Sequence, residues 1–242
     1  MQSQSNNKTK MTQFFQNLRA GILTFLALPL IILMLIFPQL RGKLEAWVRL
    51  QSGKEDGNED LNGLLDLLCG FSIAPNSRTV NWVLRRYGDR LNADLGEQLY
   101  RWSDATFAKV SPTEALSIAT TLVNFSNRVR TFDEGDRTQH LKMAYWGYKA
   151  ALIFYNRENF PLEWAKVQYN LGNIYRDLPE GNHSDKLTHA IAAFENALKV
   201  FTPEAYPQEY TLSQRQLMGA YQQKAGFQSR DRLEIEELNS NS

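Results

Sequence analysis

The chain has 242 residues, 43% of them hydrophobic, which suffices for one helical domain with an appended segment but not for two large domains. Its formal net charge is +1, yet residues 1–50 carry +5, from six basic residues against one acidic residue. The remaining residues carry 21 basic and 25 acidic groups, a balance of −4, and so lack the basic footprint that nucleic-acid binding requires.

The first predicted element is an uncharged apolar run at 20–38, AGILTFLALPLIILMLIFP. Its 19 residues match the roughly 20 that a helix needs to cross a bilayer. Signal peptides have shorter apolar cores of about 7–15 residues and a small-residue cleavage site, which this run lacks. A buried core helix is the alternative, but a soluble helix without a polar face is rare in a domain of this size. We therefore expect a retained, single-pass transmembrane anchor after an N-terminal tail at 1–19.

The segment that follows the anchor, 39–59, is predicted to be a juxtamembrane segment and tether. Its second half is polar, contains Gly53 and Gly57, and shows no apolar periodicity. Three basic residues lie near each end of the apolar run, so the charge count does not fix the orientation of the anchor in the membrane. We expect the soluble domain on the cytoplasmic side.

The only cysteine, Cys69, lies in the apolar stretch Leu-Leu-Asp-Leu-Leu-Cys. A single cysteine excludes an intramolecular disulfide and a thiolate metal cluster built from this chain alone. A small buried apolar residue is the favoured interpretation over a nucleophile.

An internal repeat with a period of 46 residues occupies the region 112–226. Aromatic rings keep their places at this offset, as Phe160 does with Tyr206, and a fixed period of 20–50 residues is typical of helical-repeat proteins. The identical pairs are Ala151 and Ala197, Leu152 and Leu198, Glu158 and Glu204, Pro161 and Pro207, Glu163 and Glu209, Gln168 and Gln214, Leu171 and Leu217, and Tyr175 and Tyr221.

Each period contains two helical patterns. Apolar residues recur at helical spacing over 163–177 and again over 186–201, and no strand pattern competes. A Pro- and Gly-containing turn separates the two helices of a pair, and the segment Thr-Pro-Glu-Ala-Tyr-Pro at 202–207 separates one pair from the next. The sequence thus predicts an all-α domain of helix pairs.

The central unit resembles the tetratricopeptide repeat (TPR) family. That family carries Leu-Gly and a following Tyr on its first helix, and Ala, an aromatic residue and Ala on its second. The matching residues are Leu171, Gly172, Tyr175, Ala190, Phe194 and Ala197. The usual unit has about 34 residues, and the longer form here is similar to repeats common in cyanobacterial multi-repeat proteins, some with caspase-like peptidase domains. The resemblance implies a short α-solenoid of antiparallel helix pairs, whose helices approach most closely at Gly172.

The resemblance covers two and a half units. The preceding unit has Phe125-Ser126 in place of Leu-Gly, and the following unit has Met218 in place of Gly and no second helix after it. Because solenoids generally need at least three repeats, the segments within 60–111 are predicted to pack on as non-repeat cap helices at 60–72, 77–90 and 94–110. Residues 227–242 are predicted to be a fraying C-terminal tail.

The sequence contains no motif that favours catalysis or a cofactor. The three histidines, His140, His183 and His189, share no metal-ligand spacing and are predicted to be solvated. A Gly-rich phosphate loop and a Gly-x-Ser-x-Gly nucleophile motif are both absent. The acidic cluster at 56–60 lacks the spacing of a calcium loop. We therefore expect neither an enzyme nor a cofactor or metal site.

A polar pattern repeats at the same offset on the first helices of two units. Asn-x-x-Asn-x-x-Arg begins at Asn124 and again at Asn170, although the apolar residues between them differ. In the resembling family the residue two after the signature Leu faces the inner groove, where an Asn amide can hold a peptide backbone. An Arg one turn later adds donors suited to carboxylates. The predicted partner-binding residues, taken as exposed, are Asn127, Arg130, Asn173 and Arg176. Chance identity among solvated residues is the alternative.

These features together predict a membrane-anchored TPR-type scaffold that binds a protein or peptide ligand, one with acidic or C-terminal carboxylate character. Assembly of a membrane complex would suit such a layout. The alternative function is a regulatory or sensor subunit of a separately encoded enzyme such as a caspase-like peptidase.

Overall fold

The computed structural model describes residues 88–240 and, before them, the single positions 63, 65, 68, 81, 84 and 85. All of these belong to one compact unit, Ala46–Ser242. The described part is all-helical and contains no strand, as the sequence predicts. The predicted anchor at 20–38 and tether lie outside the described residues.

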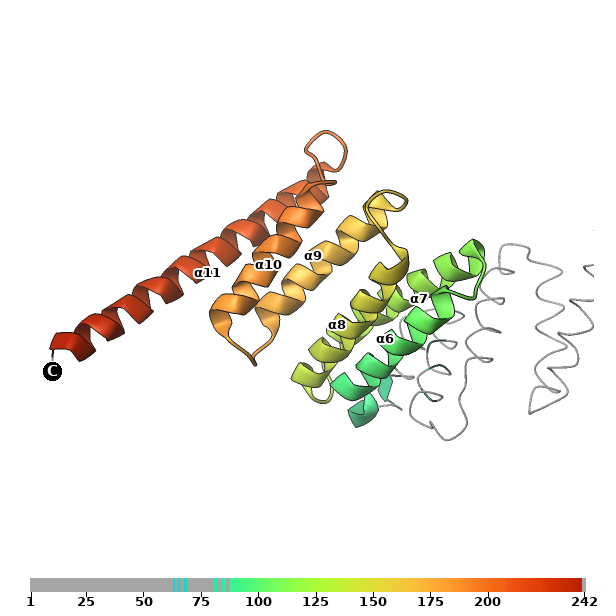
Figure 1. Ribbon diagram of the computed structural model, residues 1–242, viewed down its shortest axis with the longest axis horizontal. Coiled ribbons are helices and arrows are strands. Elements are labelled where there is room, and N and C mark those ends of the chain that lie inside the picture. Colours follow the sequence, from blue (N-terminus) through green and yellow to red (C-terminus); the bar gives the residue numbers. More distant parts are fainter. Residues whose placement is uncertain are drawn as a thin grey trace, which may run out of the picture. The chain divides into compact units, whose positions relative to one another are not determined.

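Six α-helices follow one another along the described chain (Figure 1). After a 3-10 turn at Gly88–Arg90, they are α6 (Ala93–Phe107), α7 (Pro112–Arg130), α8 (Arg137–Phe154), α9 (Pro161–Asp177), α10 (His183–Leu198) and α11 (Pro207–Ser240). Packing contacts join α7 to α8, α8 to α9, α9 to α10, and α10 to α11, while α6 packs on α8. The two predicted helix pairs are therefore α7 with α8 and α9 with α10.

Capping residues explain where these helices begin. The Ser111 hydroxyl accepts from the backbone N–H of Glu114, whose carboxylate in turn accepts from the backbone N–H of Ser111, which is a capping box. The Asn182 side chain caps α10 by accepting from the Asp185 N–H. This cap starts α10 three residues earlier than the apolar pattern suggests. The pattern also runs too far, because Phe201 is buried in the loop after α10 and not in the helix.

Helices occupy the described part of the region in which cap helices are predicted. α6 coincides closely with the predicted helix at 94–110, and the described positions 63, 65, 68, 81, 84 and 85 are helical. Leu65, Leu68 and Leu84 are fully buried in the same core as the side chains of α7 and α8. These three leucine side chains therefore belong to the same core as the helix pairs.

The C-terminal segment differs from its prediction. α11 continues as one helix through Ser240, so the expected fraying tail after 226 is wrong up to that residue. The segment 230–238, Arg-Asp-Arg-Leu-Glu-Ile-Glu-Glu-Leu, consists largely of strong helix formers and holds neither glycine nor proline. Helix propensity thus outweighs the absence of an expected packing partner.

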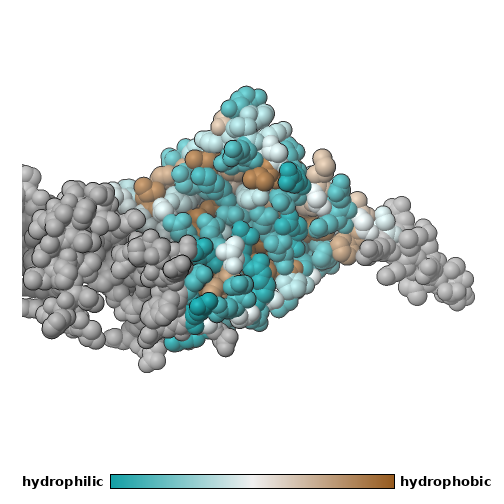
Figure 2. All heavy atoms as spheres, turned by 180° about the vertical axis from the view of Figure 1, so that it is seen from behind, coloured by the Kyte–Doolittle hydropathy of each residue, from teal (hydrophilic) through white to brown (hydrophobic). Residues whose placement is uncertain are grey.

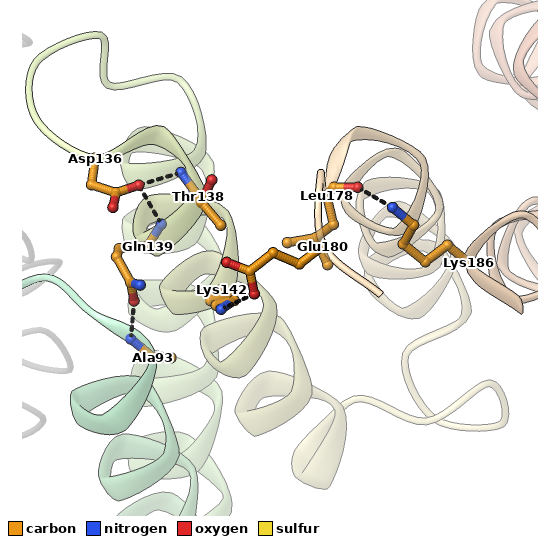
Figure 3. Close-up of polar contacts among 8 residues, drawn as sticks. All are labelled: Ala93, Asp136, Thr138, Gln139, Lys142, Leu178, Glu180 and Lys186. Carbon is orange, nitrogen blue, oxygen red and sulfur yellow. Dashed lines mark hydrogen bonds and ion pairs between the residues drawn. The ribbon is translucent and has the colours of Figure 1, made fainter. Parts of the chain in front are cut away.

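Polar contacts tie the helices together at one end of the pairs (Figure 3). The Gln139 side chain on α8 accepts from the backbone N–H of Ala93, 3.1 Å away, at the start of α6. Lys142 on α8 pairs with Glu180 at 2.5 Å, in the turn between α9 and α10. Lys186 on α10 donates to the carbonyl oxygen of Leu178, the last residue capping α9. These bonds link neighbouring helices near their ends.

A close helix approach lies at Gly172, where the resemblance leads us to expect one. A Cβ atom placed on Gly172 would lie 2.5 Å from Cε1 of Phe194, whose ring is fully buried on α10. In the first pair, a Cβ on Gly147 of α8 would lie 2.1 Å from the Ser126 hydroxyl of α7. Both pairs therefore depend on one residue without a side chain at the contact.

Gly172→Ala is expected to destabilise the protein by roughly 1–3 kcal/mol, because the methyl group would overlap a ring with no free space to move into. Gly219→Ala on α11 is the matched control, since nothing lies within 4 Å of a Cβ placed there. It should stabilise by up to about 1 kcal/mol through helix propensity. Chemical unfolding of both variants measures the effect, and an equally stable Gly172→Ala variant would contradict the close packing.

Candidate partner-binding surface

The four predicted binding residues lie on the first helices of the two pairs, Asn127 and Arg130 on α7, and Asn173 and Arg176 on α9. Three of them are half-buried, while Asn173 is only 6% exposed. The expected exposure of all four is therefore wrong for Asn173 and too high for the rest. α9 packs against both α8 and α10.

Asn127 is the centre of a polar network between three helices. Its side-chain oxygen accepts a hydrogen bond from the Tyr148 hydroxyl of α8 at 2.6 Å. The same oxygen accepts from the Asn170 side-chain amide of α9 at 3.1 Å. The network therefore joins the two helix pairs through side chains of their first helices.

Arg130 also lies near this network, since its positive charge acts on the Tyr148 phenol. Burial raises the pKa of Tyr148 to about 12, although the Arg130 charge opposes the shift. The buried Nε atom of Arg130 has no hydrogen-bond partner. An unpaired buried donor is costly in a folded protein, and such atoms often mark positions with a role other than packing.

Asn173 occupies the place of Asn127 one period later, but its surroundings differ. Its amide nitrogen donates to the backbone carbonyl of Tyr169, one turn earlier on its own helix, at 3.1 Å. The residue 46 positions after Tyr148 is Phe194, which has no hydroxyl to offer. The two asparagines are equivalent in sequence but not in hydrogen bonding.

Arg176 already has partners on two helices. Its Nε and Nη2 atoms both lie 3.1 Å from one carboxylate oxygen of Asp177. Its Nη1 atom donates to the Gln216 side chain of α11. Each guanidinium nitrogen therefore donates once within the protein, which leaves Arg176 less of its donor capacity for a ligand than its exposure alone would indicate.

Sequence reasoning missed three contributors to this surface, which are Tyr148, Asn170 and Gln216. Asn170 and Gln216 are separated by the same 46 residues and each bonds to the first helix of the preceding pair. A signal for Tyr148 was present, because it is the polar counterpart of Phe194 at the 46-residue offset. We name the set Asn127, Arg130, Asn170, Asn173, Arg176 and Gln216 the polar row.

The prediction for the histidines is wrong in one case. His183 and His189 are exposed, whereas His140 is only 1% exposed. The loop between α7 and α8 folds over the first turn of α8 and places the Phe132 ring 5.5 Å from the His140 ring. Gly135, with a φ of 88°, makes the turn that brings this loop back.

Among the described residues, no group of three or more His, Cys, Asp or Glu side chains is placed to hold a metal ion. None of the helices in the described range is long and apolar enough to cross a membrane. Comparison of the chain with protein-family models, with curated proteins and with solved structures gives no significant match.

The raised pKa of Tyr148 predicts an alkaline loss of stability. The phenol favours its protonated form in the folded chain, so its contribution is complete below pH 10 and is lost as the pH rises towards about 12. Urea unfolding of the parent and of Tyr148→Phe should differ in this window, the parent losing roughly 2 kcal/mol more between about pH 9 and about pH 12. Other tyrosines titrate in both proteins and cancel. If the free energies of unfolding of the two proteins change in parallel with pH, the pKa of Tyr148 is not raised in the folded protein.

Proposed function

We propose that this protein is a membrane-anchored TPR-type scaffold that binds another protein through the first helices of its repeats. The anchor is the apolar run at 20–38, and the binding domain is a short α-solenoid formed by α7 to α11. Assembly of a membrane complex is the cellular task that this layout suits best.

The helix packing supports a repeat architecture. Two successive pairs share the same order of contacts, the same 46-residue offset and a close approach at corresponding positions of the first helix, Ser126 and Gly172. Stacked pairs of this kind bury a continuous core while the first helices stay next to one another. Leu122 and Phe125 of α7 and Leu171 and Ile174 of α9 lie in one apolar cluster.

The polar row is the observation on which the proposed binding surface rests. Hydrogen bonds between side chains of the row join the first helix of each pair to the first helix of the next. Asn170 of α9 bonds to Asn127 of α7, and Arg176 of α9 bonds to Gln216 of α11. Helix packing requires apolar contacts at such positions, and a polar set that recurs at the repeat spacing is better suited to recognition of a ligand. The face drawn in Figure 2 is mainly hydrophilic over the described helices, with small separate hydrophobic patches.

The row favours a ligand with acidic or carboxylate character. Arg130 and Arg176 supply positive charge, and amide groups beside them supply further donors. Within the described helices, Arg176 has a carboxylate neighbour in Asp177, whereas the positive charge of Arg130 acts on the neutral phenol of Tyr148. A charged donor without a carboxylate neighbour retains attraction for an anionic group. The Arg130 side of the row is therefore the stronger half of the proposed site.

Affinity capture from detergent-solubilised membranes tests this function. Arg130→Gln together with Asn127→Ser should reduce the yield of co-purified protein at least tenfold, equivalent to about 1.4 kcal/mol of binding free energy. Lys199→Ala, an exposed change on the cap of α10, is the control and should leave capture unchanged.

Both variants should keep helical circular dichroism, so that lost capture is not confused with unfolding. The double variant capturing the same proteins as the parent in the same amounts would overturn the proposed surface.

A further inference from the structure

The two helix pairs differ in one side-chain oxygen, the hydroxyl of Tyr148. This oxygen determines how the amide of a neighbouring asparagine is oriented. Tyr148 and Phe194 stand at equivalent positions, and both rings are fully buried. Only Tyr148 carries a hydroxyl, and this hydroxyl meets Asn127 at 2.6 Å. Asn173, the counterpart of Asn127 in the second pair, has no such hydroxyl to bond to. Its amide nitrogen donates to the Tyr169 carbonyl of its own helix.

The direction of the Tyr148 hydrogen bond follows from its neighbours. The Arg130 guanidinium, whose positive charge acts on the Tyr148 phenol, has only donors and cannot accept the hydroxyl proton. The hydroxyl proton must then go to an acceptor, and the Asn127 side-chain oxygen provides it. A second donor, the amide of Asn170, reaches the same oxygen at 3.1 Å and reinforces this orientation.

When the oxygen of a side-chain amide accepts two hydrogen bonds, the nitrogen of that amide points away from the two donors. The Asn127 oxygen is occupied by Tyr148 and Asn170, so both N–H groups of its amide remain available for a ligand. A reversed Asn127 would place its NH2 group against the NH2 group of Asn170, which is unfavourable. Asn173, in contrast, spends one of its two N–H groups within α9 and is nearly covered.

We propose that Tyr148 is a positioning residue that sets Asn127, and not Asn173, as the amide that donates to a carboxylate of the ligand. This assignment rests on the proposed binding function of the polar row. It adds that the two repeats contribute unequally to ligand binding. Recognition is then centred on the first pair, where Asn127 and Arg130 donate together. The second pair contributes Asn170 as a support for Asn127.

The test uses side-chain amide NMR of the full-length chain labelled at asparagine. The probes are two dipeptides, N-acetyl-dialanine with a free carboxylate and the same peptide with its C-terminus amidated. The free carboxylate should shift the Asn127 amide resonances and leave those of Asn173 in place. The amidated peptide should bind at least about tenfold more weakly, because bonds to a charged acceptor are stronger.

Two reciprocal variants isolate the hydroxyl. Tyr148→Phe, which copies the natural residue of the second pair, should lose at least about tenfold of the affinity for the free carboxylate while remaining folded. Phe194→Tyr should make the Asn173 amide respond to the probe. An Asn127 resonance that does not respond, an equal response of Asn173 in the parent, or unchanged binding in Tyr148→Phe would each overturn the assignment.

These outcomes are distinct from a failure of the proposed function. If Tyr148→Phe binds the probe as the parent does while Arg130→Gln with Asn127→Ser still abolishes protein capture, the positioning role fails and the binding surface stands. If capture is also unchanged by that double variant, the binding surface itself fails.

Discussion

The close approach of Gly172 to the Phe194 ring sets the spacing on which the arrangement of the second pair depends. A ring that enters the space of a missing Cβ brings two backbones together and fixes their rotation, because no other position on α9 offers the same room. The first pair reaches the same condition with the residues exchanged, since its glycine, Gly147, lies on the second helix and faces Ser126. Ser126 satisfies its hydroxyl within α7 by donating to the Leu122 carbonyl at 2.7 Å.

This spacing determines which side chains of the second helix can contact the polar residues of the first helix. At the contact, position 148 or 194 lies deep between the helices and reaches the base of the polar side of the first helix. A phenylalanine there only fills volume, whereas a tyrosine also delivers a hydroxyl to Asn127. We propose that this oxygen atom makes the first pair the one suited to recognition and leaves the second pair to support it.

The helices of the repeats follow directly from the sequence, because the 46-residue period and the apolar spacing reflect the burial that forms them. Gly172 was predicted as a close contact since the resembling family requires a small residue there. The predicted helix boundaries differ from the structure where a side chain outside the helix is apolar, as with Phe201, or where a capping residue such as Asn182 starts the helix early. Such local hydrogen bonds leave no periodic signal.

The details of the candidate surface could not be derived from the pattern alone. Sequence placed Asn127 and Asn173 at equivalent positions, but burial of Asn173 and the contact of Asn127 with Tyr148 arise from which helices pack on both sides. His140 shows the same limit, as it lies among polar neighbours in the sequence and is covered by a loop in space. Periodicity reports which face of a helix is apolar, whereas tertiary packing decides how much of the polar face remains open.

The location of the partner is tested most directly by photo-crosslinking in membranes. A photoreactive residue at Asn124 lies exposed on α7, one turn before Asn127, and a second one at Ala192 lies exposed on α10. If the partner lies along the first helices, the probe at Asn124 yields a crosslinked complex and the probe at Ala192 yields none. Added partner without the crosslinking label should reduce the amount of the Asn124 complex. Crosslinks from Ala192 without any from Asn124 would contradict a binding surface on the first helices.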